Sequence, residues 1–366
     1  MINCNFTDLV LLIGTNPLPN YVVAKYFLKN NSNLQRIWLV HTEERNWQRG
    51  TREFAQYLRG VLKEKLGSEV KHVKFNEVAL SDAGLAKSIV EDIRSKLLED
   101  FLQERNTRRM HMNYTGGTKA MAVHVYRALE QEVKDRCSFS YLDARKFTLI
   151  DDDTGDITGD LREEIDISLN NLIKLHGCRK EKREERKEKC TEEKFERFRE
   201  VVKINDYAEF KEQIKGKNLG FCLERYVNEV LTKKAQEDED FKRKNITVEM
   251  NWNIYNRDSS EKNFELDLII LNGYQVCCIS CGTALGRGHE EKLKLKGMEV
   301  IHRANQIGGD ESRAVLVTCV DDVGVRRISD DLMRDTGSTE KKLKVLGKSH
   351  LQEDVLWQEI KEYIFD

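Results

Sequence analysis

An excess of charge of one sign is missing from this chain. Its 61 Lys and Arg residues are balanced by 63 Asp and Glu residues, which gives a net charge of −2 at pH 7. Nothing global marks it as a nucleic-acid binder, so any such binding must come from a local patch. A run of eighteen apolar residues is also missing, and Met1–Phe6 does not resemble a signal peptide. We predict no membrane segment.

Regularly paired cysteines are missing too. The nine cysteines are odd in number and are scattered through apolar segments, so we expect reduced thiols in a cytoplasmic protein. Cys278 and Cys281 match a CxxC spacing, but residues three apart on a strand face opposite sides of the sheet. This pair is poorly placed for a disulfide or a shared zinc ion, and we interpret it as core packing.

Proline is almost absent, and both prolines of the chain fall in one loop, Gly14–Asn20. The loop follows a buried strand predicted at residues 9–13. Because proline fixes φ and cannot continue a strand, the loop is stiff and presents Thr15, Asn16 and Asn20 at the C-terminal end of that strand. In an open α/β sheet, ligands bind at this edge.

A second polar loop joins a predicted strand, residues 110–114, to a predicted helix, residues 120–129. It contains the adjacent glycines Gly116 and Gly117 and ends at Lys119. Glycine lets backbone approach a ligand closely, and the free amides and dipole of a helix start favour an anion. The spacing is not that of a Walker A motif, and an ordinary strand-to-helix turn explains this loop equally well when it is taken alone. Two polar loops at one edge favour a single phosphate-binding site.

Strands and helices alternate through the first half of the chain. Predicted strands lie near residues 8–14, 36–41, 70–75, 108–114, 137–142 and 147–151, and predicted helices near 20–30, 50–66, 84–104 and 118–135. This alternation predicts a parallel, doubly wound α/β sheet. The length of 366 residues is sufficient for a second domain with its own core.

The two polar loops, GTNPLPNY at residues 14–21 and NYTGGTKAM at residues 113–121, resemble those of the CARF domain of type III CRISPR ancillary proteins. Ile37–Thr42 is similar to the second strand of that family, and Tyr141–Arg145 is also in its style. On this resemblance we assign residues 1–176 to a Rossmann-like CARF sensor domain.

The resemblance implies a homodimer that binds a cyclic oligoadenylate across its two-fold axis. We expect cyclic tetra-adenylate, because a two-fold site accommodates a ring of even symmetry. Backbone amides near Gly116–Thr118 would hold phosphate together with Lys119, and the first loop would contact ribose or adenine through Thr15, Asn16 and Asn20. The predicted ligand-binding residues are Gly14, Thr15, Asn16, Asn20, Thr42, Asn113, Thr115, Gly116, Gly117, Thr118 and Lys119.

The second half opens with a stretch dense in Lys, Arg and Glu. We interpret residues 177–205 as a charged linker, with nucleic-acid contact as the less favoured alternative. Residues 206–366 then form a second domain, in which Asn272-Gly273 is a strong hairpin signal. The predicted elements are a helix at 219–231, strands at 246–252, 264–271 and 274–281, a helix at 290–306 and a strand at 314–319.

That αβββαβ order resembles the core of restriction-endonuclease-like folds and the effector half of CARF-linked nucleases. The resemblance implies Mg²⁺ or Mn²⁺ held by carboxylates, with a metal-activated water that a lysine orients. Glu224 resembles the helix acid of such sites and Asp267 the hairpin acid, and Glu265 lies on the same strand face as Asp267. The family's (D/E)xK motif is missing, because Ser280-Cys281-Gly282 stands in its place.

A stripe of charged residues on the following helix offers replacements. Lys292, Lys296, Glu299 and Arg303 recur at spacings that share one helical face. We favour migration of the active site to this helix, with Lys296, Glu299, Lys292 and Ser280 as the catalytic candidates. A solvent-facing ladder of charged pairs and a lost nuclease kept as a scaffold are the alternatives.

We therefore predict a metal-dependent nuclease that a cyclic oligoadenylate activates and that cuts RNA or DNA. Two alternatives stay open. One is a regulatory protein that binds the cyclic oligoadenylate but has an inactive effector domain. The other is a ring nuclease that cuts its own ligand, by attack of a ribose 2′-hydroxyl on the adjacent phosphate and without a metal.

Overall fold

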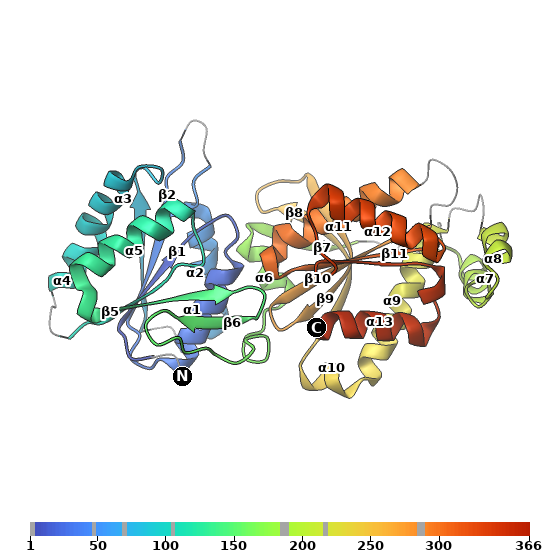
Figure 1. The fold of residues 1–366 in the computed structure, drawn as a ribbon, viewed down its shortest axis with the longest axis horizontal. Coiled ribbons are helices and arrows are strands. Elements are labelled where there is room, and N and C mark those ends of the chain that lie inside the picture. The colour runs from blue at the N-terminus through green and yellow to red at the C-terminus, as the bar shows by residue number, and fades with distance from the viewer. Residues whose placement is uncertain are drawn as a thin grey trace. The chain divides into compact units, whose positions relative to one another are not determined.

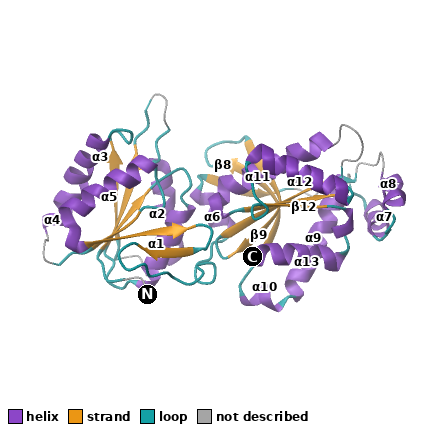
Figure 2. Ribbon diagram, viewed as in Figure 1, coloured by secondary structure: helices purple, strands orange, loops and turns teal. Residues whose placement is uncertain are grey.

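The computed structural model describes residues 4–45, 49–67, 72–103, 107–183, 190–214, 219–283 and 290–366. It divides into two compact units, Met1–Cys178 and Arg179–Asp366, each with its own six-stranded sheet (Figure 1). Helices cover both faces of each sheet (Figure 2). No helix among the described residues is both long enough and apolar enough to span a membrane.

The sheet of the first unit has the strand order β3-β2-β1-β4-β5-β6. Its strands are parallel except for β6, which runs antiparallel to β5. They are β1 (Asp8–Leu12), β2 (Arg36–Thr42), β3 (Lys74–Leu80), β4 (Met110–Asn113), β5 (Cys137–Asp143) and β6 (Thr148–Asp151). The predicted doubly wound fold is confirmed, although β3 begins later in the chain than the predicted strand at 70–75.

The helices of the first unit are α1 (Leu18–Asn30), α2 (Arg52–Leu66), α3 (Ala86–Ile93), α4 (Glu99–Gln103), α5 (Lys119–Val133) and α6 (Leu169–Leu175). α3 and α5 cover one face of the sheet, and α1 and α2 lie on the other (Figure 1). Val10 and Leu12 of β1 pack in one buried cluster with residues of α3 and α5. β1 is buried along its whole length because helices cover both faces, which is why it reads as a continuous apolar run.

The sheet of the second unit has the order β12-β11-β10-β9-β8-β7. Its strands are β7 (Cys178–Lys182), β8 (Thr247–Asn256), β9 (Lys262–Asn272), β10 (Gln275–Gly282), β11 (Arg313–Thr318) and β12 (Leu343–Leu346). The strands β8, β9 and β10 are antiparallel, whereas β10, β11 and β12 are parallel. The predicted hairpin is confirmed, with Gly273 at φ +61° in the turn between β9 and β10.

The helices of this unit are α7 (Glu192–Val202), α8 (Tyr207–Ile214), α9 (Gly220–Glu237), α10 (Glu239–Arg243), α11 (Glu290–Gly308), α12 (Asp322–Thr336) and α13 (Glu353–Phe365). Apart from the short helix α10 between α9 and β8, the order α9-β8-β9-β10-α11-β11 matches the αβββαβ core predicted for a restriction-endonuclease-like domain. α9 and α13 cover one face of the sheet, and α11 and α12 cover the other (Figure 1).

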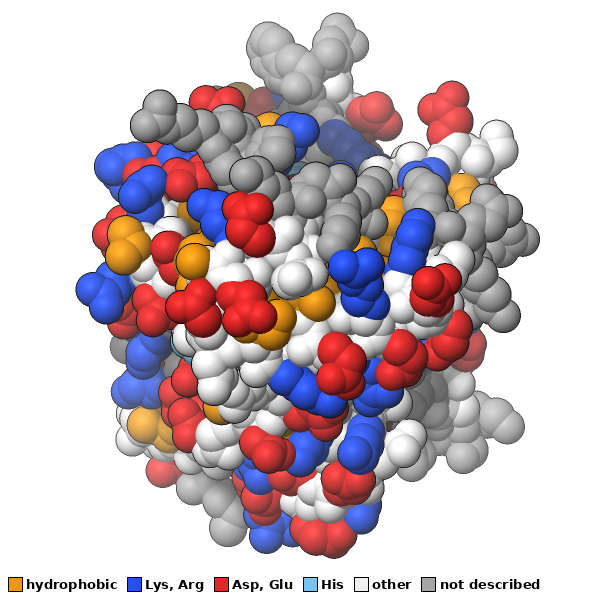
Figure 3. All heavy atoms as spheres, turned by 90° about the vertical axis from the view of Figure 1, so that its right-hand side faces the viewer, with side chains coloured by type: hydrophobic (Ala, Val, Ile, Leu, Met, Phe, Trp, Pro, Cys, Tyr) orange, Lys and Arg blue, Asp and Glu red, His pale blue; other side chains and the backbone are white. Residues whose placement is uncertain are grey.

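The interpretation of residues 177–205 as a solvated linker is wrong for the described part of that stretch. β7 is an edge strand of the second sheet. Farther along, α7 buries Phe195 and Phe198 in the core of the second unit. Most of the charged residues of α7 lie on the outside of that helix, and acidic and basic side chains are interspersed over the end of the unit shown in Figure 3.

Replacing Phe198 with alanine should lower the free energy of unfolding of the second unit by about 3–5 kcal/mol, the usual cost of truncating a buried phenylalanine. Its side chain is only 1% exposed and its ring centroid lies 6.0 Å from that of Tyr226. Urea unfolding of the full chain measures the change. Arg197→Ala on the exposed side of the same helix is the control, and equal stabilities of the two variants would restore the linker interpretation.

Candidate functional site

The two polar loops of the first unit meet at the point where the strand order reverses. β1 and β4 are parallel neighbours, so the loops that follow them leave the sheet side by side. A Cβ atom on Gly14 would lie 3.2 Å from the backbone nitrogen of Gly117. In doubly wound sheets this switch point forms the ligand crevice. The sequence-based prediction that both loops share one edge is therefore confirmed.

Glycine is required in the second loop for two separate reasons. Gly117 has φ +74°, in the left-handed region that side chains disfavour. Gly116 is crowded instead, since a Cβ there would lie 2.1 Å from the carbonyl oxygen of Leu12. The backbone of this loop therefore packs directly on the end of β1.

Several of the predicted ligand-binding side chains hold the loops rather than face outward. Asn20 is only 1% exposed, and its Nδ2 donates to the carbonyl oxygen of Leu12 at 3.0 Å. It is therefore not available for the predicted contact with ribose or adenine. Three other predicted residues are also buried or bridge backbone groups. Oδ1 of Asn113 accepts from the amide of Thr115, and Oγ1 of Thr115 accepts from the amide of Leu142. Thr42 is hydrogen-bonded to Thr51.

A buried histidine that the sequence analysis did not select supports the second loop. The two ring nitrogens of His111 lie 2.7 Å from the hydroxyls of Ser138 and Ser140, and Ser140 also accepts from Nδ2 of Asn113 at 3.1 Å. Burial lowers the pKa of His111 to about 4, so the ring is neutral at physiological pH. His111 thus fixes the end of β4 through a network of uncharged groups.

The remaining predicted residues are accessible to a ligand. Thr15, Thr118 and Lys119 are exposed, and Asn16 is half-buried. Thr118 Oγ1 accepts from the amide of Met121 at 3.2 Å, which is the bond of a helix cap, and Lys119 is the first residue of α5. This edge therefore presents a helix N-terminus, a glycine-rich turn and one ammonium group, a combination suited to phosphate.

The second unit contains a cavity of about 150 Å³ that gathers the predicted catalytic residues. Its charged and polar lining is Glu265, Asp267, Ser280, Lys296, Glu299 and Arg303. β9, β10 and α11 supply these side chains, so the charged stripe on α11 faces the hairpin and is not a solvent-facing ladder along its whole length. Lys292 is the exception, because it is exposed and does not line the cavity.

Lys296 occupies the space next to the position of the missing lysine. A Cβ atom on Gly282 would lie 3.5 Å from Cδ of Lys296 and only 2.6 Å from Cδ2 of Leu293. The ammonium of Lys296 donates to the carbonyl oxygen of Cys281 at 2.5 Å. On the strand itself, Ser280 Oγ donates to Oδ2 of Asp267 at 3.1 Å. The cavity therefore contains a lysine and a carboxylate from two different elements.

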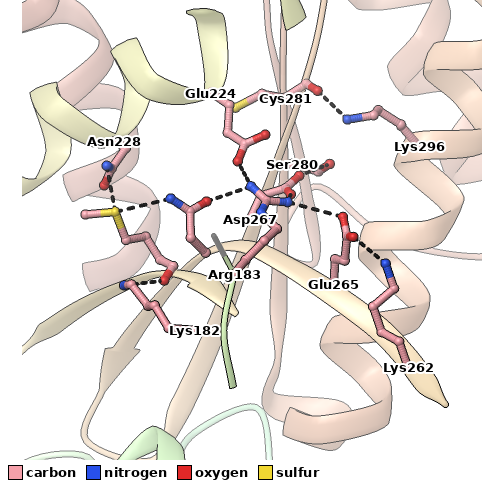
Figure 4. A network of polar contacts seen from close by, with 12 residues as sticks. Lys182, Arg183, Glu224, Asn228, Lys262, Glu265, Asp267, Ser280, Cys281 and Lys296 are labelled. Atoms are coloured by element: carbon pink, nitrogen blue, oxygen red, sulfur yellow. Dashed lines mark hydrogen bonds and ion pairs between the residues drawn. The ribbon is translucent and has the colours of Figure 1, made fainter. Parts of the chain in front are cut away.

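The three predicted metal ligands come together around an arginine. The guanidinium of Arg183 contacts Glu224, and its Nη1 lies 3.2 Å from Oε2 of Glu265 and 3.1 Å from Oδ1 of Asp267 (Figure 4). The Arg183 side chain is 10% exposed. Nothing in the sequence distinguishes Arg183, because it is one arginine within a stretch rich in Lys and Arg.

Arg183 and Lys262 offset part of the negative charge of this cluster. Burial by itself would raise the pKa of Glu265. The hydrogen bond from Lys262 and the positive charges of Lys262 and Arg183 have the larger effect, so the pKa of Glu265 lies below its usual value. Among the described residues, no three carboxylate, histidine or cysteine side chains are grouped closely enough to hold a metal ion. The acids expected to bind Mg²⁺ or Mn²⁺ do not fit that ion while Arg183 lies among them.

The fold and the two sites together define a class of protein. The chain is a two-unit α/β protein, with a Rossmann-like unit that has a polar switch-point edge and a restriction-endonuclease-like unit built around an acid cluster. Residues 9–168 match the family model of the Card1 CARF domain, so the first unit belongs to the CARF domains, as the sequence resemblance indicated. No curated protein sequence matches the chain.

Three solved structures are similar in fold. Can2 from Sulfobacillus thermosulfidooxidans, solved in complex with cyclic tetra-adenylate, is 15% identical, with a TM-score of 0.62 and coverage of 98% of this chain and 99% of Can2. Protein VC1899 from Vibrio cholerae is 15% identical, with a TM-score of 0.64 and the same coverage. A type III CRISPR defence DNA nuclease activated by cyclic oligoadenylate is 18% identical over 85% of this chain and 45% of that one, with a TM-score of 0.50.

Replacing Gly117 with alanine should destabilise the first unit more than replacing Gly155 does. Both glycines have positive φ, +74° and +66°, which costs a side chain about 1–2 kcal/mol. Only Gly117 is also crowded, since its Cβ would lie 2.9 Å from Cβ of Leu12, whereas nothing lies within 4 Å at Gly155. Chemical unfolding of both variants isolates the cost of the close approach, and equal losses would show that the second loop does not pack tightly on the end of β1.

Proposed function

We propose that this protein is a CRISPR ancillary protein whose first unit binds a cyclic oligoadenylate and whose second unit is a nuclease under its control. The observation that carries the proposal is the CARF match over residues 9–168, together with the phosphate-compatible loops at the switch point of that unit. The fold shared with Can2, which was solved with cyclic tetra-adenylate, supports the same ligand. With reduced cysteines throughout its described part, the chain suits the cytoplasm.

In the proposed complex, the amides of Gly116–Thr118 and the ammonium of Lys119 hold phosphate, and Thr15 and Asn16 contact ribose or adenine. Asn20, Thr42, Asn113 and Thr115 position these groups from behind. The ring lies on the two-fold axis of a homodimer, since a ring of even symmetry presents the same groups to two identical sites. Ligand binding favours one dimer geometry only to the extent that the ring binds that geometry more tightly.

In the second unit, the cavity between the hairpin and α11 is the proposed cleavage site for RNA or DNA. Lys296 supplies positive charge for the phosphate that is attacked, and Asp267 and Glu299 supply carboxylates on opposite walls of the cavity. Ser280, bonded to Asp267, orients that carboxylate. Lys292 lies outside the cavity and is not part of this proposal.

A second candidate function has one specific observation in its favour. Arg183 ion-pairs with all three acids of the cluster, an arrangement compatible with an inactive effector. The protein would then bind the cyclic oligoadenylate as a regulator, without cleaving nucleic acid. Ligand binding with no cleavage under any tested metal condition would favour this candidate over the nuclease.

Replacing Lys119 with glutamate should abolish tight binding of cyclic tetra-adenylate. The change removes a charge-assisted contact of about 1.5–3 kcal/mol and places an anion at the phosphate position, so we expect more than a ten-fold loss of affinity in calorimetry. Lys29→Glu is the matched control, because Lys29 is exposed in the last turn of α1, away from the switch-point edge. Unchanged affinity in Lys119→Glu would remove this loop from the site.

The parent titration also reports the stoichiometry. One ring bound per two chains, with a dimer in sedimentation, is the result expected of a shared two-fold site. A monomer that binds one ring by itself would contradict the shared site while leaving the ligand class intact.

Lys296→Ala should slow cleavage of nucleic acid by about 100-fold, the usual loss when one group that stabilises transition-state charge is removed. Lys292→Ala should leave the rate unchanged, because its side chain is exposed outside the cavity. Asp267→Asn should abolish cleavage without changing ring affinity. The measurement is gel-based cleavage of labelled RNA and DNA with saturating cyclic tetra-adenylate and either Mg²⁺ or Mn²⁺. Equal rates for the two lysine variants would reject migration of the active site to α11.

A further inference from the structure

The position of Arg183 is the least expected feature of the second unit. Its guanidinium contacts one carboxylate from α9, Glu224, and two from β9, Glu265 and Asp267. These are the acids that resemble the metal ligands of restriction-endonuclease-like sites. The arginine therefore occupies the place in which such a site would hold its divalent cation (Figure 4).

Asn251 fixes the arginine in this position from two directions. The backbone N–H of Arg183 donates to the carbonyl oxygen of Asn251 at 2.7 Å, and Nη2 of Arg183 donates to Oδ1 of Asn251 at 2.6 Å. Asn251 itself has φ +56°, a conformation that asparagine tolerates better than most residues. The contact between Arg183 and the acids is thus built into the local backbone of β8 and is not a chance surface pair.

A cation at this place stabilises the ionised form of the acids. The side chains of Glu224 and Asp267 are each 15% exposed, so little water is available to weaken their mutual repulsion. Like charges that share a partly buried site raise one another's pKa unless an opposite charge intervenes. Either a divalent ion or a guanidinium can meet that need, but the two cannot occupy one position together.

Arg183 directly follows β7, which lies at the edge of its sheet. β7 is the edge strand of its sheet, so among the described strands it pairs with β8 alone. Its lysines hold it to β8 by side-chain contacts, with Nζ of Lys180 3.7 Å and Nζ of Lys182 4.8 Å from the ring centroid of Trp252. An edge strand is released by breaking one set of ladder bonds, whereas a central strand would require two.

We propose that Arg183 is the resident cation of this acid cluster and that it competes with a divalent metal ion for Glu224, Glu265 and Asp267. The cluster binds Mg²⁺ or Mn²⁺ only when the guanidinium has left it. This inference rests on the proposed function, because it assigns the acids to a nuclease site. It explains why the described side chains satisfy the acid pattern of that fold and yet form no metal site.

The test is a titration of the metal-stripped full chain with Mn²⁺. Electron paramagnetic resonance measures the bound ion, and neither nucleic acid nor cyclic oligoadenylate is present. Arg183→Gln should bind Mn²⁺ at least ten-fold more tightly than the parent protein, because it removes the competing charge and keeps a polar side chain. The double variant Arg183→Gln/Asp267→Asn should lose that gain, which places the ion at the acid cluster.

Arg179→Gln is the matched control. Arg179 lies on β7, shortly before Arg183, but its guanidinium contacts Glu181, the carbonyl oxygen of Ser259 and the ring of Tyr255 rather than the cluster. Its Mn²⁺ affinity should equal that of the parent. If Arg183→Gln does not fold, Arg183→Lys keeps the charge but lacks the planar fork, and it should show a smaller gain over the parent.

Mn²⁺ binding by a folded Arg183 variant that is no tighter than that of the parent would overturn the inference. That failure is distinguishable from failure of the proposed function, because ring affinity is read in a separate titration that does not involve Mn²⁺. Loss of ring binding with the Mn²⁺ gain intact would overturn the cyclic-oligoadenylate proposal and leave the competition standing.

Discussion

The contact of one guanidinium with three carboxylates organises the second unit. Arg183, the residue that follows β7, contacts α9 through Glu224, β9 through Glu265 and Asp267, and β8 through Asn251. Side chains of three elements thus converge on one charge. Removing any one partner of such a buried set leaves the others unpaired, so the cluster constrains the sheet as much as it defines a site.

The edge of the first unit follows the opposite principle, because uncharged groups build it. Gly14, Gly116 and Gly117 allow the two loops to touch, and Asn20 and Asn113 tie them to the ends of β1 and β4. Neutral amides and hydroxyls fix the shape of the loops without adding charge. The positive groups at this edge are the start of α5 and one lysine, and no nearby carboxylate of the loops offsets their attraction for an anion.

Much of this architecture was predictable from the sequence, and the parts that were not share a cause. The spacing of apolar residues and the residue types in the turns identified the doubly wound sheet, the hairpin at Gly273 and the common face of Glu265 and Asp267. β7 was missed, because a strand made of Arg, Lys and Glu has no apolar alternation. It is stabilised by contacts of its lysine ammonium groups with Trp252, which lies far away in the sequence. Asn20 was expected to face the ligand, because polarity alone does not reveal which loop side chains are buried.

The packing around Gly282 leaves no room for a side chain at this position. Leu293 already fills the volume in which a side chain at position 282 would begin, and Lys296 lies beside it. A lysine introduced at 282 alone would be forced into the wall of α11. A strand-borne lysine therefore requires a coordinated change on β10 and α11, and a single substitution at 282 is expected to cost stability.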